Sequence, residues 1–294
     1  MKYISQYKNG ATVTVFAPYD CKNNCPFCVN KKDYKENPHF DMDAVITSMI
    51  RLHKITPNCD IVITGGEPFA DLEKLQRLIL AVAWMNDINF GQHKLFINTT
   101  LPFDEYSKET ILEFIDINKA YITGLNISRH VNKYVTECND EIFDEIPVPV
   151  RINCVLYTQK EAAKAKDIYD RFISRKSVTG IQFREDYTTT TDLNLYAFEE
   201  NSTFTHVLSS FNINKQPEQF FNVNKIFSND FRWNCKIIDK VSYHRTLPWS
   251  KIIYNDKQEI NDITIDPRGN IYDDWNEYGE KLYISTYKQL FQEE

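Results

Sequence analysis

The stretch PYDCKNNCPFCVN, residues 18–30, places three cysteines within eight positions. Cys21, Cys25 and Cys28 come just after ATVTVFAP, a segment that begins at Ala11 and predicts a β-strand. Three thiols this close together at the end of a strand indicate a shared ligand. The elements around the triplet decide which fold carries it.

Strand-like and helix-like segments alternate over the first two thirds of the chain. Strands are predicted over 11–18, 60–66, 94–100, 121–128, 150–157 and 178–186, and helices over 41–55, 71–85, 107–117 and 158–176. Alternation of this kind is typical of parallel βαβ units. We therefore predict an α/β fold, a partial (β/α)6 TIM-like barrel over residues 1–190.

Several of the later strands turn polar on one face toward their carboxyl ends. Asn98, Ser128, Asn153, Gln182 and Arg184 alternate with apolar residues. A strand of an ordinary parallel sheet is apolar on both faces, so this pattern favours a barrel that holds a polar ligand inside. Barrel active sites lie at the carboxyl ends of the strands, where these residues are expected to converge. Any one of them could instead satisfy a local hydrogen bond.

The last third, residues 191–294, has shorter strand-like runs and turns. DPRGN, residues 266–270, predicts a turn between two of these runs. We expect this extension to close the barrel and to contribute Asp273 and Asp274 to a substrate pocket. A solvated turn explains these two aspartates equally well.

The cysteine triplet allows three interpretations. A structural zinc site needs four ligands, and His39 would have to be the fourth. A redox CxxC pair would leave Cys21 unexplained. An iron–sulfur cluster held by three thiolates would leave one iron open to a small molecule. Cys59, Cys138, Cys154 and Cys235 stand apart and are expected to be small buried hydrophobic residues.

At these residues the sequence resembles the radical S-adenosylmethionine (radical SAM) superfamily. The hallmark of that superfamily is CxxxCxΦC after the first barrel strand, where Φ is aromatic. Here the motif is CKNNCPFC, with Phe27 as the aromatic residue. TGGEPF, residues 64–69, follows the second predicted strand and is similar to the family's GGEP stretch. The resemblance covers residues 11–190.

The resemblance implies a [4Fe–4S] cluster bound by Cys21, Cys25 and Cys28, with S-adenosylmethionine chelating the remaining iron. The other contacts it implies are Gly65, Gly66 and Glu67 at the methionine amino group, the backbone of Phe27 at the adenine, Ser128 at the ribose, and Arg151 or Asn153 at the carboxylate.

The same resemblance implies an enzyme reaction. Reductive cleavage of S-adenosylmethionine would give a 5′-deoxyadenosyl radical that takes a hydrogen atom from the substrate. An electron donor such as a flavodoxin or ferredoxin would be a partner, and an anaerobic host would suit the cluster.

The substrate is expected to be a small molecule. The last third of the chain contains a single cysteine, Cys235, so a second, auxiliary iron–sulfur cluster is not expected. The pocket candidates are Asn98, Gln182, Arg184, Asp273 and Asp274. The carboxylates and side-chain amides among them are acceptors that suit the N–H groups of a purine-like edge, and the chain looks similar to the queuine lyase branch, which would release a 7-deazaguanine base by C–N cleavage. The alternatives are a peptide, another nucleoside-like metabolite, or a metal-binding protein without activity.

Charge and hydropathy narrow the partners. The formal net charge is −7 and no run of Lys and Arg stands out, which argues against nucleic acid. The longest apolar run, 78–85, is too short to cross a bilayer, and the N-terminal residues are polar. We therefore expect a cytoplasmic protein without a membrane partner.

Overall fold

The computed structural model describes residues 3–4, 11–16, 21–28, 39–87, 91–102, 105–186, 202–220, 232–246, 259–260, 262–273 and 281–282. The chain forms two compact units. Unit 1 contains residues 1–22, 29–125 and 254–294, and unit 2 contains residues 23–28 and 126–253. The two units divide the chain differently from the boundary expected at residue 190.

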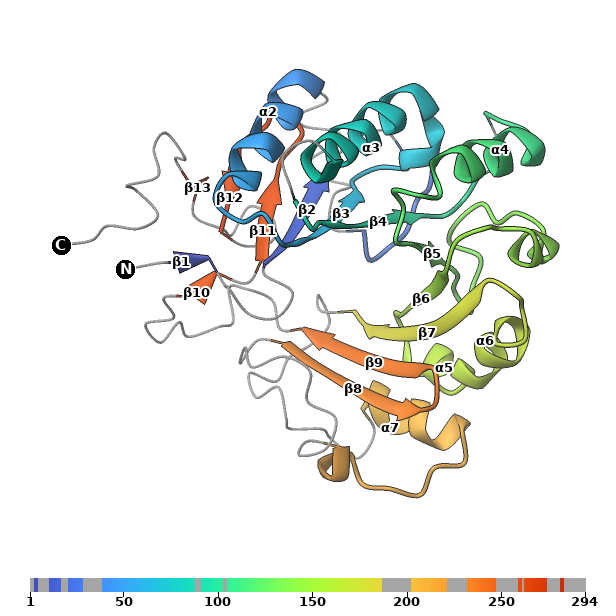
Figure 1. Ribbon diagram of the computed structural model, residues 1–294. Helices are drawn as coiled ribbons and strands as arrows, with labels where there is room; N and C mark the ends of the chain where they lie inside the picture. Colours follow the sequence, from blue (N-terminus) through green and yellow to red (C-terminus); the bar gives the residue numbers. More distant parts are fainter. Residues whose placement is uncertain are drawn as a thin grey trace. The chain divides into compact units, whose positions relative to one another are not determined.

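Unit 1 is a mostly parallel sheet with helices against it (Figure 1). Its strands are β1 (Tyr3–Ile4), β2 (Thr12–Phe16), β3 (Asp60–Thr64), β4 (Lys94–Thr99), β10 (Glu259–Ile260), β11 (Asp262–Ile265), β12 (Ile271–Tyr272) and β13 (Lys281–Leu282). The order is β13-β12-β11-β2-β3-β4, while β1 pairs separately with β10. β11, from the last third of the chain, pairs in parallel with β2. The C-terminal extension therefore adds a strand beside β2, the first strand that the sequence predicts.

The helices of unit 1 begin where the sequence predicts. They are α2 (Met42–His53), α3 (Leu72–Asp87) and α4 (Lys108–Asn118), with the short 3-10 helix η1 (Pro68–Ala70). The Asp41 carboxylate accepts the N–H of Ala44 at 3.0 Å, and the Ser107 hydroxyl accepts that of Thr110 at 3.2 Å. Each cap satisfies a backbone donor that the first helical turn leaves without a partner.

The predicted turn at residues 266–270 is confirmed, and it packs against α2. Gly269 has φ 77°, a left-handed conformation that suits glycine. The Gly269 carbonyl accepts the Ser48 hydroxyl at 2.6 Å, and the Pro267 carbonyl accepts the Asp41 N–H at 2.8 Å. The turn therefore joins the C-terminal strands to the first helix of the unit.

Unit 2 contains four neighbouring strands of the main sheet, and they end in a hairpin. Its strands are β6 (Val150–Leu156), β7 (Val178–Glu185), β8 (Arg232–Ile238) and β9 (Val241–Thr246), in the order β6-β7-β9-β8. β9 runs parallel to β7 and antiparallel to β8. β5 (Gly124–Ser128) lies where the chain passes from unit 1 into unit 2.

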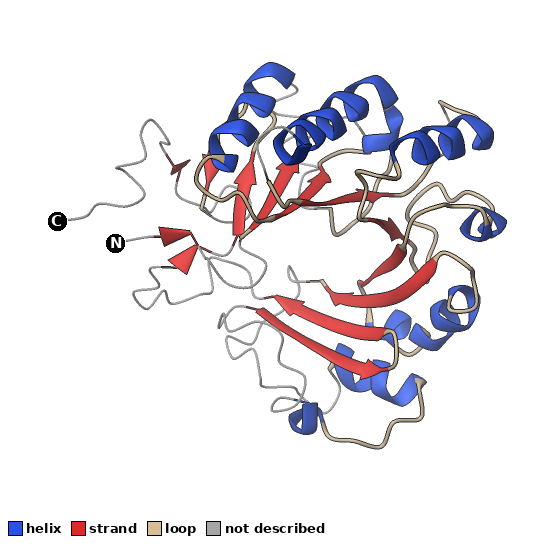
Figure 2. Ribbon diagram, in the orientation of Figure 1, coloured by secondary structure: helices blue, strands red, loops and turns tan. Residues whose placement is uncertain are grey.

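The helices of unit 2 correct two expectations. They are α5 (Gln159–Ala162), α6 (Ala165–Phe172), α7 (Thr203–Ser210) and the 3-10 helices η2 (Asp140–Asp144) and η3 (Pro217–Phe220), shown in blue in Figure 2. The helix predicted over 158–176 is broken between α5 and α6. The N–H of Lys164 bonds to the carbonyl three residues back instead of four, and its φ of −109° leaves the helical range. The predicted elements also lacked α7, although Ser202 caps it.

The isolated cysteines behave as expected. Cys59, Cys138, Cys154 and Cys235 are free and buried. None of the helices in the described ranges is long and apolar enough to cross a membrane.

Candidate functional site

The cysteine motif forms a short loop with a turn at its end. All three thiols are half-buried. The Cys28 N–H donates to the Cys25 carbonyl at 3.2 Å, which closes a turn over Pro26 and Phe27. The Cys25 thiol also lies 3.7 Å from the carbonyl oxygen of Tyr134. The second half of the motif is therefore tied to the loop that follows β5.

The donor chemistry of the motif suits an iron–sulfur cluster. Cys21, Cys25 and Cys28 offer three thiols, and thiolate is the usual ligand of such clusters. Within the described ranges, no three His, Cys, Asp or Glu side chains gather closely enough for a single metal ion. A four-iron cluster needs a different arrangement, because each thiolate binds a separate iron. His39, the fourth ligand that a zinc site would need, is exposed.

The Phe27 side chain packs in an aromatic group within unit 2. Its ring centroid lies 4.9 Å from that of His130, 5.5 Å from that of Tyr134 and 6.2 Å from that of Tyr157. Burial lowers the pKa of His130 to about 4, and its Nδ1 accepts the N–H of Val155 at 3.2 Å. A neutral imidazole thus holds the loop beside Phe27. Phe27 could be identified from its motif, whereas its three ring partners could not.

Glu161 anchors this aromatic group to α5. The Tyr134 hydroxyl and the Asn132 amide both donate to one carboxylate oxygen of Glu161. The other oxygen accepts the N–H groups of Tyr157 at 2.7 Å and Thr158 at 3.1 Å. Thr158 and Glu161 form a capping box. The letters TQKE carry that signature, so a capping search would have found Glu161.

The second motif lies at the carboxyl end of β3. Gly65 has φ 122°, so a residue with a side chain would be strained there. Glu67 is 3% exposed, and one of its oxygens accepts the Thr99 hydroxyl and the Phe69 N–H, the latter at 3.1 Å. The other oxygen accepts both the N–H and the hydroxyl of Thr100 at 2.7 Å. Burial raises the pKa of Glu67, and these hydrogen bonds oppose that rise. Glu67 therefore ties the end of β3 to the end of β4.

The remaining predicted residues of unit 1 are only partly described. Gly66 and Asn98 are half-buried, and Asn98 immediately precedes Thr99. Asp273 is half-buried just after β12, whereas Asp274 lies outside the described residues.

The predicted residues of unit 2 lie on neighbouring strands. Asn153 of β6 is directly opposite Gln182 of β7, and both side chains are buried. Arg184 and Ser128 are half-buried, and Arg151 is exposed. The structure therefore brings Asn153 and Gln182 together in one row of the sheet.

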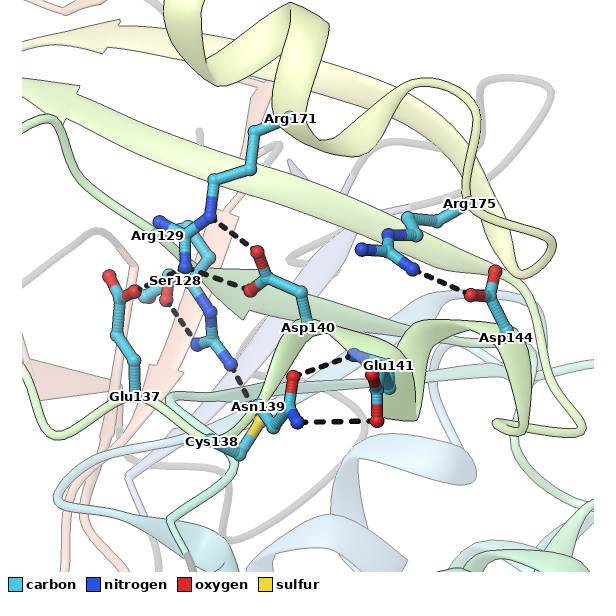
Figure 3. Close-up of polar contacts among 10 residues, drawn as sticks. All are labelled: Ser128, Arg129, Glu137, Cys138, Asn139, Asp140, Glu141, Asp144, Arg171 and Arg175. Atoms are coloured by element: carbon cyan, nitrogen blue, oxygen red, sulfur yellow. Dashed lines mark hydrogen bonds and ion pairs between the residues drawn. The ribbon is translucent and has the colours of Figure 1, made fainter.

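The loop after β5 is anchored by a fully buried arginine that the sequence did not reveal (Figure 3). Arg129 donates to the Ser128 carbonyl at 2.8 Å and to the Cys138 sulfur at 2.9 Å. Its guanidinium carbon lies 5.3 Å from the centre of the Phe143 ring. The predicted ribose contact, Ser128, is thus held through its backbone by its neighbour.

Two ion-pair groups hold the same loop against α6 and the turn that follows it (Figure 3). Arg171 contacts Glu137 at 2.8 Å and Asp140 at 2.6 Å, and Arg175 contacts Asp144 at 2.7 Å. These pairs set the path of residues 137–144, which lie between Tyr134 and Tyr157 of the aromatic group in the chain.

Comparison with known proteins agrees with this geometry. Residues 9–133 match a family model described as a 4Fe-4S single cluster domain. No curated protein matches the chain.

Two solved structures share the fold. One is anSMEcpe with bound AdoMet, with a TM-score of 0.50 and 20% identity, covering 68% of this chain and 58% of that one. The other is SuiB from Streptococcus suis bound to S-adenosylmethionine, with a TM-score of 0.54 and 14% identity, covering 94% of this chain and 62% of that one. The chain thus spans less than two thirds of either protein.

At these identities the likeness concerns the fold, and it confirms the predicted α/β partial-barrel class. The cluster-domain match covers the CKNNCPFC and TGGEPF motifs together. Residues 9–133 are thus similar to a 4Fe-4S single cluster domain, and the fold of the chain is similar to that of both AdoMet-bound structures.

Proposed function

We propose that the chain is an enzyme that holds a [4Fe–4S] cluster through Cys21, Cys25 and Cys28 and uses S-adenosylmethionine as its second cofactor. The observation that carries this proposal is that three half-buried thiols stand at this spacing inside the matched cluster domain. The two structures that share the fold were solved with AdoMet bound, which supports the choice of the second cofactor.

In the second motif, the backbone and the Glu67 side chain have different roles in binding S-adenosylmethionine. Both oxygens of Glu67 already accept two hydrogen bonds each. The proposed contact with the methionine amino group therefore falls to the backbone of residues 65–67, and the carboxylate of Glu67 holds that backbone in place. Gly65 lets the chain approach the ligand because no Cβ intervenes.

Bound together, the two cofactors would supply a 5′-deoxyadenosyl radical that takes a hydrogen atom from the substrate. The protein's part is to position that substrate and to exclude water. Phe27 and the rings around it provide an apolar wall beside the motif. In this proposal the backbone of Phe27 contacts the adenine, Ser128 contacts the ribose, and Arg151 contacts the carboxylate.

Anaerobic reconstitution with iron and sulfide tests the cluster. We expect the wild type to take up about four irons per chain and to convert S-adenosylmethionine to 5′-deoxyadenosine when dithionite is added. Cys25→Ala should lose both the iron and the reaction. Cys235→Ala removes a thiol outside the motif and should keep its iron. Full cleavage by Cys25→Ala would refute the assignment.

We propose queuine as the substrate, with release of a 7-deazaguanine base by cleavage of the C–N bond to its cyclopentene-diol group. The support is chemical: the predicted pocket residues Asn98, Gln182 and Asp273 offer acceptors for the N–H groups of a purine-like base. A flavodoxin or ferredoxin would supply the electron. Mass spectrometry should detect the free base after incubation with queuine, S-adenosylmethionine and dithionite.

Deuterium labelling separates this proposal from a peptide or another nucleoside-like substrate. Queuine deuterated on its cyclopentene ring should transfer deuterium into 5′-deoxyadenosine. Transfer from a different labelled compound, with none from queuine, would keep the enzyme class and replace the substrate.

A further inference from the structure

The β8–β9 hairpin continues a polar row across the sheet of unit 2. Asn153 on β6 lies opposite Gln182 on β7, and Gln182 lies opposite Ser242 on β9. Ser242 pairs with Lys236 on β8, two residues from Asn234. Paired residues share a face, as do alternate residues along a strand. Asn153, Gln182 and Asn234 therefore all lie on one face, and we call these three residues the amide row.

The helices described in unit 2 pack on the other face of this sheet. Phe183 follows Gln182, and Tyr243 follows Ser242. Successive side chains of a strand point to opposite faces of the sheet, so Phe183 and Tyr243 lie on that other face. The Tyr243 ring lies 4.7 Å from Phe204 of α7, and the Phe183 ring lies 6.1 Å from Phe211 just beyond it. The amide row thus lies on the face that α7 does not cover.

Each residue of the amide row is buried with an unpartnered acceptor. Asn153, Gln182 and Asn234 are 8%, 5% and 8% exposed, and their side-chain oxygens accept no hydrogen bond from the residues that the structure describes. Buried polar atoms almost always have a partner, so three such amide oxygens on one face need an explanation. Neighbouring strands lie about 4.8 Å apart, so the row spans about 14 Å from β6 to β8.

We infer that the amide row is a substrate-binding wall that recognises a small molecule through its N–H and O–H groups. The unpartnered atoms are acceptors, so they select a ligand rich in donors. This assigns Asn153 to the substrate instead of the S-adenosylmethionine carboxylate, which is itself an acceptor. It also adds Asn234, from the hairpin, to the site. The inference rests on the proposed function, because it takes the ligand to be the substrate of that reaction.

The first test asks whether these amides serve the fold. Thermal unfolding is followed for anaerobically purified, cluster-loaded wild type, Asn234→Leu and Gln182→Leu. An apolar side chain of similar size removes an unsatisfied oxygen, so we expect the unfolding midpoint to stay the same or rise. A fall of more than about 3 °C would show that the amide has a structural partner, and would overturn the inference.

The second test measures binding by equilibrium dialysis with queuine as the probe. Asn234→Leu and Gln182→Leu should each weaken binding about tenfold, since each leaves a ligand donor without an acceptor. Asp239→Asn, in the exposed turn of the same hairpin, should bind as the wild type does. Equal binding by all variants would refute the amide row and leave the proposed substrate standing.

The outcome in which wild type does not bind queuine has a separate meaning. It would refute the proposed substrate, and the unfolding midpoints would then decide the amide row alone. A stable Asn234→Leu protein would support the row as a binding surface, and a destabilised one would reject it.

Discussion

Replacing Glu67 should lower the unfolding free energy of unit 1, by a smaller amount for Glu67→Gln and by a larger amount for Glu67→Ala. Each carboxylate oxygen of Glu67 accepts one backbone N–H and one hydroxyl, from Phe69 and Thr99 on one side and from Thr100 on the other. Glutamine keeps one oxygen and replaces the other with an NH2 group. A hydroxyl can rotate away from that group, but a backbone N–H cannot. Whichever way the amide turns, one backbone N–H loses its acceptor.

The expected magnitudes follow from that count. One buried N–H without an acceptor costs about 1–3 kcal/mol of unfolding free energy, which is our expectation for Glu67→Gln. Glu67→Ala leaves two such N–H groups, so about 2–6 kcal/mol is expected. Glu113 is an exposed carboxylate on α4, and Glu113→Ala should change stability by less than about 0.5 kcal/mol.

Urea unfolding under anaerobic conditions, followed by circular dichroism, measures these differences. We expect the urea concentration at the unfolding midpoint to decrease in the order wild type, Glu67→Gln, Glu67→Ala. If Glu67→Ala unfolded at the same urea concentration and with the same slope as Glu113→Ala, the carboxylate would not tie β3 to β4, and the reasoning would fail.

Three further predictions use the same unfolding assay. Burial lowers the pKa of His93 to about 4, so the folded protein binds fewer protons than the unfolded chain between about pH 6.5 and 4, and the unfolding free energy should fall by roughly 1–3 kcal/mol as the pH drops through that window. His93→Gln should make the unfolding free energy less dependent on pH in that window. An unchanged slope in the variant would show that His93 is not the group responsible. Gly269→Ala should cost about 2–4 kcal/mol, because φ is 77° and the new Cβ would come within 2.6 Å of the Ala44 backbone; a wild-type midpoint would contradict that geometry. Tyr134→Phe should cost about 1 kcal/mol by removing the hydroxyl that donates to Glu161, with Glu161→Gln as the matched partner variant, and additive effects of the two changes would mean that they do not interact.

The helix starts and the parallel strands could be predicted because their signals are local. Asp41 and Ser107 each stand just before an apolar periodic run, and the structure shows both side chains capping the helix as expected. The DPRGN turn was equally legible, because Gly269 occupies a conformation that other residues avoid. Such features depend on a few neighbouring residues, so sequence alone is enough to find them.

The break between α5 and α6 was not predictable in the same way. Residues 158–176 contain no proline or glycine, and their apolar periodicity is continuous. The break appears only in the backbone bonds around Lys164. Arg129 was missed for a similar reason, since nothing in its neighbours announces a fully buried guanidinium bonded to Cys138.

The sequence by itself determined that three thiols stand at a fixed spacing after a strand, because spacing is a covalent property of the chain, and this motif predicts a cluster. It also predicted the alternation of strands and helices over the first two thirds of the chain. The tertiary structure alone decided that the Glu67 carboxylate accepts hydrogen bonds from Thr99 and Thr100, and that Asn234 lies on the same face of the sheet as Asn153. Contacts of that kind join residues far apart in the chain, so they exist only after strand register has placed the side chains on one face.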